Sequence, residues 1–275
     1  MVQGYDEYII TLGELRAIQL VELELLCEVD RICRKNGITY RIVAGTLLGA
    51  VRHGGFIPWD DDADVAFLRE EYERFRSACE TELDTSRFYF QDHRNTPGYR
   101  WGYGKLRRKD TQFVRLNQEH MPYEQGIFID IFPYDYVPDN KFSRQIHCFK
   151  CFLYRKTFWS PIGQKSAKGV GKLIYKLLSK IPTHSLYRCY ERFIERSNKR
   201  KSNWIRILTF PTPTRDHGYK RIWADATSEY HFEGVSFYGP KDYDEYMTFK
   251  YGDYMELPPE KERKIHPISK LKLLN

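Results

Sequence analysis

Two aspartates at alternate positions, Asp62 and Asp64, have the type and spacing that most directly suggest chemistry in this 275-residue chain. Alternate residues of a β-strand project from the same face, so both carboxylates would point together while Ala63 and Val65 face the core. Two neighbouring carboxylates repel each other unless a cation lies between them. Carboxylate oxygens suit Mg²⁺ or Mn²⁺, which also bind phosphate oxygens. We therefore predict a metal site here; the alternative is that the acids at 60–62 form an ordinary solvated turn.

A phosphate-binding turn is predicted shortly before these acids. Gly45 and Thr46 begin a short apolar segment that we expect to be helical through Arg52. Glycine lets the backbone approach a ligand closely, and the N–H groups at a helix N-terminus attract anions. Thr46 lies sixteen residues before Asp62, which strengthens an otherwise weak signal. We expect Arg52 and His53 to add positive charge beside the phosphates; the alternative is that they are surface residues at a helix end.

The segments that must position these residues alternate between helical and strand patterns. Apolar residues at helical spacing predict a long helix between a capping box at Thr11 and a stop at Gly37. Runs rich in β-branched and aromatic residues predict strands, so that helices packed on a sheet, an α+β fold, are expected. The predicted strands are Ile38–Ala44, Asp62–Leu68, Phe88–Asp92, Tyr99–Arg107, Thr111–Leu116 and Gly126–Phe132, and further helices are predicted at Glu70–Leu83 and Tyr243–Lys250.

Basic residues are concentrated between 141 and 201. This segment has 16 Lys and Arg but only two acids, so it carries +14, whereas the whole chain carries +7 and the remainder therefore −7. We predict a core formed by 1–140 and 202–275, interrupted by a basic helical insertion at 141–201. Local basicity of this size favours docking to an anionic partner. Four lysines recur every four residues along one face of the insertion, opposite a mostly aliphatic face: Lys168, Lys172, Lys176 and Lys180.

Composition excludes several classes of protein. With 41% hydrophobic and 29% charged residues, the chain suits a globular protein with a substantial core. It has no run of about 18 apolar residues, so no membrane-spanning helix is expected. The first ten residues are acidic and lack a basic segment, so no secretory signal is expected either. Six irregularly spaced cysteines favour reduced thiols in the cytoplasm over a disulfide framework.

A CxxC pair, Cys148 and Cys151, raises the question of a zinc site. Cys189, His147 and His184 lie near it in the sequence. A structural zinc site needs four such ligands, usually in two closely spaced pairs. Because no second CxxC or tight Cys/His pair is present, we favour packing of two cysteines one helical turn apart, with zinc as the alternative.

Residues 45–64 read Gly-Thr-Leu-Leu-Gly, then Arg-His, then Phe-Ile-Pro-Trp-Asp-Asp-Asp-x-Asp. This segment closely resembles the LicD family, which includes bacterial phosphocholine transferases and is related to the fukutin-type ribitol-phosphate transferases. The resemblance continues at 105–107, at 129–133 and at 251–266. It thus covers both ends of the chain, whereas the basic middle segment matches only in its general helical and lysine-rich character.

The resemblance implies a nucleotidyltransferase-like core sheet, in which a carboxylate from a neighbouring strand completes the metal site. Asp130 fits this role, because it is the lone acid of the apolar segment 127–132. A carboxylate buried there would be costly without a cation or a hydrogen-bond donor. A structural hydrogen-bonding role is the alternative for Asp130, and Asp135 is the reserve candidate.

The resemblance also implies a reaction. CDP-choline would be split so that phosphocholine passes to a sugar hydroxyl and CMP leaves, with the three acids holding the metal. Asp130 would also be placed to take the proton of the acceptor hydroxyl. Lys105 and Arg107 would contact the diphosphate, unless they are ordinary charges on a strand. His266, at the end of the last matching segment, would join the substrate-binding residues.

Donor and acceptor follow from the family rather than from particular residues. Aromatic cages bind quaternary ammonium groups, and 21 Tyr and 5 Trp are available. CDP-ribitol or CDP-glycerol would instead need hydrogen-bonding residues, which are also present. The implied acceptor is a lipid-linked glycan precursor, of teichoic acid or lipopolysaccharide type, at the cytoplasmic face of the membrane. We therefore expect the basic helix over 168–181 to dock on an anionic membrane surface; the alternative is that its apolar face packs on the core.

Two other classes of function are weaker. A nucleotidyltransferase acting on nucleic acid would need aromatic residues interleaved with the basic ones. The lysines of the insertion instead lie opposite an aliphatic face, so no nucleic-acid partner is predicted. A catalytically inactive scaffold would not need Asp62, Asp64 and Asp130, which are all present.

Overall fold

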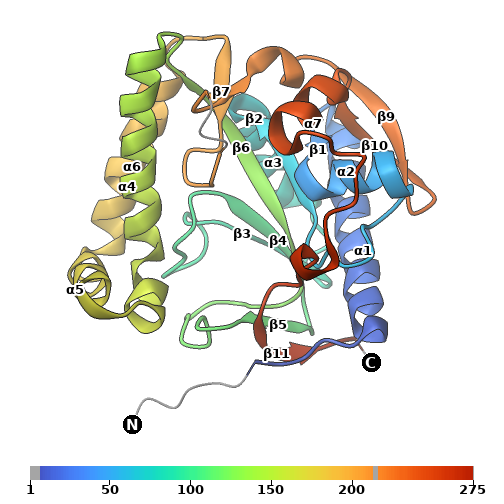
Figure 1. Cartoon of the computed structure of the whole chain (residues 1–275), viewed down its shortest axis with the longest axis horizontal. Coiled ribbons are helices and arrows are strands. Elements are labelled where there is room, and N and C mark those ends of the chain that lie inside the picture. The colour runs from blue at the N-terminus through green and yellow to red at the C-terminus, as the bar shows by residue number, and fades with distance from the viewer. Residues whose placement is uncertain (1–6, 213–215, 275) are drawn as a thin grey trace.

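The computed structural model describes residues 7–212 and 216–274, and its helices surround a curled mixed sheet (Figure 1). The first helix, α1 (Leu12–Asn36), forms where the sequence predicts it. Thr11 and Glu14 make a reciprocal capping box, and Gly37 ends the helix in the left-handed conformation with φ of 58°. The α+β class is therefore confirmed for the described part of the chain.

The other elements follow in chain order. The remaining α-helices are α2 (Ala44–His53), α3 (Arg69–Glu82), α4 (Lys141–Ser166), α5 (Gly169–Leu178), α6 (Thr183–Asn198) and α7 (Tyr243–Tyr251), with short 3₁₀ turns η1 (Arg221–Ala224) and η2 (Glu260–Glu262). The strands are β1 (Arg41–Ile42), β2 (Asp64–Leu68), β3 (Phe88–Gln91), β4 (Gly104–Arg108), β5 (Gln112–Arg115), β6 (Phe128–Val137), β7 (Trp204–Arg206), β8 (Tyr219–Lys220), β9 (Thr227–Phe232), β10 (Val235–Pro240) and β11 (Ile268–Lys272).

The main sheet contains the strands on which acids are predicted to act. Its order is β1-β2-β6-β4-β3, with β7 paired to the far end of β6 and β8 paired to β7. β2 runs parallel to β6, whereas β4 runs antiparallel to it. β6 is buried along nearly its whole length, which requires an apolar strand such as this one. It forms the centre of the sheet.

α1 and α3 pack against this sheet. On the central strands, the side chains next to the predicted site residues point to the opposite face of the sheet. Val65, Leu106 and Ile131 are examples, and they belong to the main hydrophobic core together with the apolar face of α1. Two small sheets complete the fold: β9 pairs with β10, and β5 pairs with β11. The second of these ties the C-terminal strand to the centre of the chain.

The helices α4, α5 and α6 lie between β6 and β7 in the chain and gather along one side of the molecule (Figure 1). No helix among the described residues is both long and apolar enough to cross a membrane. The division into a core and an insertion at 141–201 stays a prediction. A second cluster of buried residues, separate from the main core, lies between these helices and the sheet: Val137, Cys151, Phe158, Leu186, Tyr187, Tyr190, Ile194 and Leu208.

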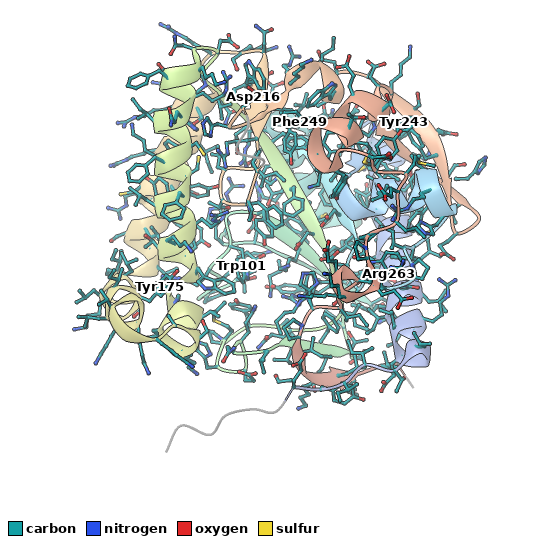
Figure 2. The ribbon with its side chains drawn as sticks, in the orientation of Figure 1. Trp101, Tyr175, Asp216, Tyr243, Phe249 and Arg263 are labelled. Atoms are coloured by element: carbon teal, nitrogen blue, oxygen red, sulfur yellow. The ribbon has the colours of Figure 1, made fainter. Side chains whose placement is uncertain are left out.

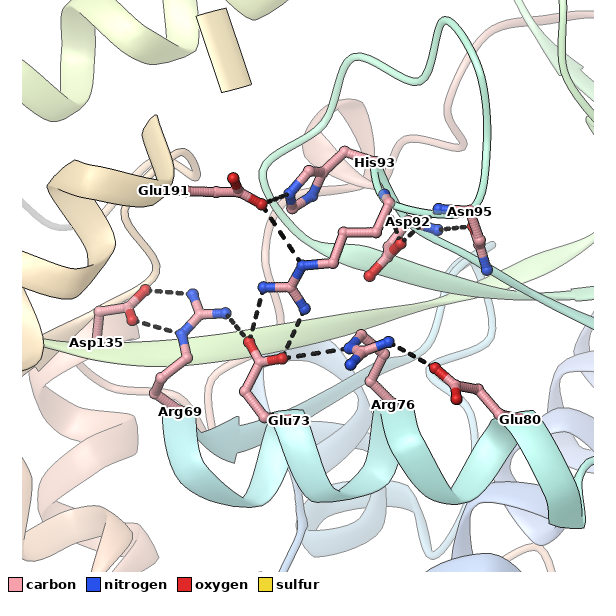
Figure 3. Close-up of polar contacts among 10 residues, drawn as sticks. Arg69, Glu73, Arg76, Glu80, Asp92, His93, Asn95, Asp135 and Glu191 are labelled. Carbon is pink, nitrogen blue, oxygen red and sulfur yellow. Dashed lines mark hydrogen bonds and ion pairs between the residues drawn. The ribbon is translucent and has the colours of Figure 1, made fainter. Parts of the chain in front are cut away.

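An ion-pair network joins the helices to the sheet (Figure 3). Asp135 of β6 is fully buried and accepts two hydrogen bonds of 2.7 Å from the guanidinium of Arg69 on α3. Arg94 lies between Glu73 of α3, at 2.6 Å, and Glu191 of α6, at 3.6 Å. The network therefore fixes α6 against the edge of the core.

Several boundaries differ from the predictions. The strand predicted over 38–44 is reduced to β1, because Val43 already caps α2. The strand predicted over 99–107 forms only from residue 104. The β9–β10 hairpin was not predicted, although its turn residues Glu233 and Gly234 both have positive φ, a conformation that favours glycine.

Candidate active site

Three of the predicted site residues lie in one row across the sheet. Asp64 of β2 is the register partner of Asp130 of β6, and Asp130 is the register partner of Lys105 of β4. Register partners project from the same face, so two acids and one lysine share a surface. The ammonium of Lys105 forms a buried ion pair with Asp130. Strand pairing thus brings together residues that are far apart in the sequence.

Asp61 anchors the acidic loop that precedes β2. Its carboxylate is 1% exposed and lies 3.1 Å from Arg115 Nη1 and 2.9 Å from His266 Nδ1. Its neighbour Asp62 lies 3.9 Å from Arg115 Nη2 and 3.6 Å from His266 Nδ1. Two separate segments, β5 and the approach to β11, therefore close over the acids. The structure brings His266 into the site, and its role in substrate binding stays a prediction.

Asp60, Asp62 and Asp64 are half-buried and lie close together without enough opposing charge. Burial raises the pKa of Asp62 to about 6. Burial, followed by repulsion from neighbouring acids, raises the pKa of Asp64 and of Asp60 well above the usual range. Lys250 of α7 interacts with Asp64, but its own burial lowers its pKa. Such an excess of negative charge favours a bound cation.

Gly45 and Thr46 position the acids from the first turn of α2. Thr46 Oγ1 accepts a hydrogen bond of 2.8 Å from the backbone N–H of Asp64 and so fixes the start of β2. A Cβ atom on Gly45 would lie 2.5 Å from Asp60 Oδ2, so a larger residue there would have to displace the Asp60 carboxylate. These contacts explain both residue types without a ligand. Their predicted binding of phosphate stays a prediction.

Arg52 and His53 lie outside the pocket that the acids line. Arg52 Nη1 donates to the carbonyl oxygens of Tyr254, at 2.8 Å, and Glu256, at 3.2 Å. His53 is exposed, with its ring edge-on to Trp59. The structure therefore does not bring either residue to Asp62, Asp64 or Asp130, although Arg52 and Asp60 line a further recess. Arg52 ties the segment after α7 to α2, and the predicted phosphate contacts of both residues stay predictions.

A pocket of about 420 Å³ opens over the row of acids and is lined by cations. Lys105, Arg107 and Arg115 line it from β4 and β5, while Arg155 and Lys156 approach from α4. Arg107 is held by hydrogen bonds to Gln91, at 2.6 Å, and to the carbonyl of Gly126, at 2.7 Å. Positive side chains beside carboxylates suit a phosphorylated ligand that arrives with a divalent cation.

Aromatic side chains line another part of this pocket. Trp101 lies between α4 and the sheet (Figure 2), with its ring centroid 5.7 Å from that of Trp159 and 6.2 Å from that of Tyr103. Phe210 faces Tyr103, with centroids 6.0 Å apart. Faces of aromatic rings attract cations, quaternary ammonium groups included. The pocket therefore combines a charged part for phosphate with an aromatic part.

A second recess of about 260 Å³ adjoins the first and shares acids with it. Asp62, Asp64 and His266 line both spaces. Lys250 and Tyr251, from the end of α7, line only the second. Acids shared by two recesses suit a reaction that joins two substrates.

The predicted acids fit a magnesium site in their chemistry. Asp62, Asp64 and Asp130 supply only oxygen donors, line one pocket and bring more negative charge together than nearby cations balance, which matches the preference of Mg²⁺ and Mn²⁺. In the conformation described, however, residues 7–212 and 216–274 contain no His, Cys, Asp or Glu cluster already closed around one point. Asp130 is turned to Lys105 instead. Metal binding and the ligand roles of the acids remain predictions.

The cysteines of the insertion have a different environment. Cys151 is buried, and its sulfur lies 3.5 Å from His147 Nδ1, whereas Cys189 is exposed. The described residues contain no group of three or more side chains arranged to hold a metal. The packing interpretation of the CxxC pair, with zinc as its alternative, stays a prediction.

Comparison with known proteins extends the likeness over nearly the whole chain. Residues 37–165, which include the three acids, match the family described as LicD/FKTN/FKRP, nucleotidyltransferase domain. The Haemophilus influenzae protein named lipopolysaccharide cholinephosphotransferase LicD is 30% identical over 271 residues, which cover 94% of this chain and 98% of that protein. The chain belongs to the LicD family.

Two shorter matches are consistent with this assignment. An uncharacterized Rickettsia typhi protein is 42% identical over 65 residues, and an uncharacterized Rickettsia prowazekii protein is 48% identical over 48 residues. These matches cover 24% and 18% of this LicD-family chain, and 20% and 18% of the respective relatives. The prediction of an enzyme of the LicD phosphotransferase type is confirmed by the full-length relative.

Sequence reasoning missed several residues that this LicD-family protein gathers at its site. Arg115 contacts the acidic loop, yet its place in a short strand gave no signal. Asp60 and Asp61 belong to the same run of acids, but the alternating strand pattern selected only Asp62 and Asp64. Lys250 directly precedes the matching segment 251–266, a position that could have drawn attention to it.

Proposed function

We propose that this protein transfers phosphocholine from CDP-choline to a sugar hydroxyl of a glycan precursor of the cell surface, with Mg²⁺ or Mn²⁺ as its cofactor. The observation that carries the proposal is the likeness to a cholinephosphotransferase over 94% of this chain and 98% of that relative. Acids beside a cationic and aromatic pocket support it. We further propose that the strands around β6 and β2 form a nucleotidyltransferase-like core, as the name of the matching family suggests.

The reaction would join an oxygen of the acceptor to the phosphorus that carries choline. The bond between that phosphorus and the bridging oxygen of CMP breaks, CMP leaves, and the proton of the acceptor hydroxyl is released. A divalent cation held by Asp62, Asp64 and Asp130 would neutralise phosphate charge. Lys105, Arg107 and Arg115 would orient the diphosphate from the pocket wall.

Proton removal is assigned to Asp130. Its carboxylate faces the pocket and is held by the ammonium of Lys105. Burial lowers the pKa of Lys105 to about 8, so this lysine can also give up a proton within the range of neutral to mildly alkaline pH. The pair would fix the carboxylate beside the attacking hydroxyl, where a general base is needed.

The choice of choline over a polyol is supported by the aromatic side chains of the pocket. Trp101, Trp159 and Tyr103 would surround the trimethylammonium group, which has no hydrogen-bond donors to offer. A ribitol or glycerol group would instead require several hydrogen-bonding partners. CDP-ribitol and CDP-glycerol remain the alternative donors, and direct binding decides among the three.

The acceptor is proposed to be a lipid-linked glycan precursor. The relative from Haemophilus influenzae is named for lipopolysaccharide, and a precursor of that type or of teichoic acid type would offer the sugar hydroxyl here. Such precursors carry a lipid, so we propose that the enzyme works in the cytoplasm at the inner face of the membrane.

The test is to incubate the protein with Mg²⁺, a glycan acceptor and each of CDP-choline, CDP-ribitol and CDP-glycerol, and to measure CMP release and transfer to the acceptor. We expect CMP release from CDP-choline, its loss with a chelator, and its loss in Asp64→Asn. Isothermal titration with the three donors ranks their affinity. Tighter binding of a CDP-polyol, with transfer of that group, would overturn the choline assignment, and inactivity with all three would overturn the reaction.

A further inference from the structure

α5 is an amphipathic helix whose apolar face is exposed. None of its residues is buried. Its aliphatic residues recur at positions i, i+3, i+4 and i+7 and therefore lie on one face of the helix. Exposure of such an apolar face to water is unfavourable. Packing of this face on the core, the alternative considered for this segment, is therefore excluded. The exposed fractions of its aliphatic side chains are 75% for Val170, 59% for Leu173, 51% for Ile174 and 58% for Leu177.

α5 is attached to α4 through a different face. Tyr175 packs on Gly163, where an added Cβ would lie 2.6 Å from the tyrosine ring. Ser179 Oγ, just after the helix, lies 3.3 Å from Gln164 Oε1. The periodicity of the helix places Tyr175 on the face opposite the aliphatic side chains of α5. Attachment through Tyr175 therefore leaves those aliphatic side chains uncovered.

α4 extends the exposed apolar surface. Phe149, Phe152 and Leu153 are 59%, 41% and 48% exposed. Phe152 and Gly163 are about three helical turns apart and share a face of α4, so α5 packs beside the exposed row. Lys156 Nζ lies 5.4 Å from the ring of Phe152 and 6.0 Å from that of Tyr175. The exposed apolar side chains of α4 and α5 are together called the outer face: Phe149, Phe152, Leu153, Val170, Leu173, Ile174 and Leu177.

Positive charge lies along one side of the outer face. Lys172, Lys176 and Lys180 are exposed, and within residues 7–212 and 216–274 none of them takes part in an ion pair among the salt bridges of the structure. At helical spacing Lys176 and Lys180 lie next to the aliphatic row. A second copy of this chain would bring like charges together at such a surface, which is unfavourable. An anionic lipid surface offers both an apolar layer and negative headgroups.

We propose that the outer face docks this protein on an anionic lipid bilayer. The aliphatic and aromatic side chains enter the headgroup boundary, and the lysines contact lipid phosphates. Lys156, whose ammonium lies against Phe152 of the outer face, also lines the active pocket, so docking holds that pocket beside the membrane. The proposal deepens the proposed function and rests on it only for the lipid-linked acceptor; vesicle binding itself requires neither donor nor metal.

Vesicle co-sedimentation tests this docking. The protein is mixed with vesicles of phosphatidylcholine alone, or of phosphatidylcholine with phosphatidylglycerol. We expect the wild type to pellet with the anionic vesicles only. Leu173→Ser/Leu177→Ser should weaken binding at least about tenfold, because it removes apolar side chains that enter the headgroup boundary. Lys176→Glu/Lys180→Glu should do the same, because each basic residue near such a surface contributes about 1 kcal/mol. The control Lys241→Glu/Lys272→Glu makes the same charge change at exposed positions outside α4 and α5 and should bind like the wild type.

Three results would overturn the docking surface. These are recovery of the wild type in the supernatant with both vesicles, equal binding by all variants, or a dimer in solution that Leu173→Ser/Leu177→Ser dissociates while vesicle binding stays unchanged. Because α5 has no buried residue, the variants should keep the wild-type unfolding temperature. CMP release with a soluble acceptor should also stay unchanged in them. Loss of CMP release in a preparation that still binds vesicles counts against the proposed function and not against docking.

Discussion

Replacing Asp62 or Asp64 by Asn removes one proposed metal ligand with little change in size. We expect each variant to lose transfer by at least about a thousandfold, because the charge that opposes the phosphates can no longer be held. In metal-free buffer each variant should unfold at a slightly higher temperature, since burial raises the pKa of both acids and penalises their charged forms. CMP release and thermal unfolding measure the two effects. Near-normal turnover by either variant would contradict the site.

Trp101 and Trp159 test the origin of donor choice. Trp101→Ala and Trp159→Ala should raise the KM for CDP-choline about tenfold or more, because a cation on an aromatic face gains about 1–2 kcal/mol. The KM for a CDP-polyol should change less. Trp→Phe at the same positions keeps a ring face and serves as the matched control. Equal losses for both donors would show that the rings shape the pocket without recognising choline.

For single residues, the sequence predicted those whose neighbours in the chain already indicate a role. It missed those that reach the site only through tertiary packing. Asp62 and Asp64 could be found because they occupy alternate positions in the sequence, although only Asp64 lies on a strand, since β2 begins there and Asp62 belongs to the preceding loop. Asp130 could be found because it is the lone acid in an apolar run. Arg115 and Lys250 reach the site from β5 and α7. No neighbouring residue in the sequence indicates that they lie in the site, because tertiary packing alone determines their position.

Among the elements, β6 contributes to two separate polar sites. Asp130 faces the pocket, whereas Asp135 is fully buried against Arg69 and Asn198. Asp135→Ala should reduce the free energy of unfolding by about 3 kcal/mol, because it removes the buried partner of Arg69 and leaves only the 3.2 Å ion pair of Arg69 with the partly exposed Glu73. Urea unfolding measures this loss.

Activity then separates the two roles of Asp135. We expect CMP release per folded molecule to stay near that of the wild type, which distinguishes a structural acid from the reserve ligand considered from the sequence. Loss of transfer in a variant that keeps its stability would instead assign Asp135 to the reaction.

The contact between α4 and α6 should respond to acid. His147 Nε2 lies 2.8 Å from Ser197 Oγ, and burial, then the charges of Arg206 and Lys150, lowers the pKa of His147 from 6.5 to about 4. The unfolded chain therefore binds a proton between pH 6.5 and about 4 that the folded protein does not, so stability falls as the pH drops through this range. His147→Gln should lack this contribution, which we expect to be about 2 kcal/mol.

Comparison of the two proteins by denaturant unfolding at pH 7 and pH 4.5 isolates this effect, since the remaining titrating groups are common to both. Parallel losses of stability in wild type and His147→Gln would show that His147 does not titrate as its burial requires.

Element prediction succeeded where one physical signal was strong. The capping box at Thr11 and the left-handed Gly37 delimited α1 within the chain. β1 was overestimated because β-branched residues at 38–43 satisfy strand propensity, whereas the start of α2 takes Val43. The short strands β7 and β11 depend on partners more than 40 residues away, and β8 pairs only with β7, so propensity cannot report such pairing.

For the whole molecule, a bound divalent cation should act on stability. Mg²⁺ that binds only the folded protein raises its free energy of unfolding, by about 2.7 kcal/mol at a hundredfold excess over Kd. We expect a concentration-dependent rise in the unfolding temperature of the wild type and none for Asp64→Asn. NaCl of equal ionic strength controls for screening of the repelling acids. An equal rise with NaCl would mean that screening, and not a specific site, relieves the repulsion.

Arg115, His266 and β11 meet around Asp61, and this arrangement has a consequence for synthesis of the chain. The ribosome makes the acidic loop at 60–64 long before it makes His266 or the strand that pairs with β5. Until the 266–272 segment emerges, Asp61 lacks one of its partners and β5 lacks its strand partner. The active pocket therefore cannot close during translation of the core. Chains stalled before residue 266 should be inactive even where their main sheet has already formed.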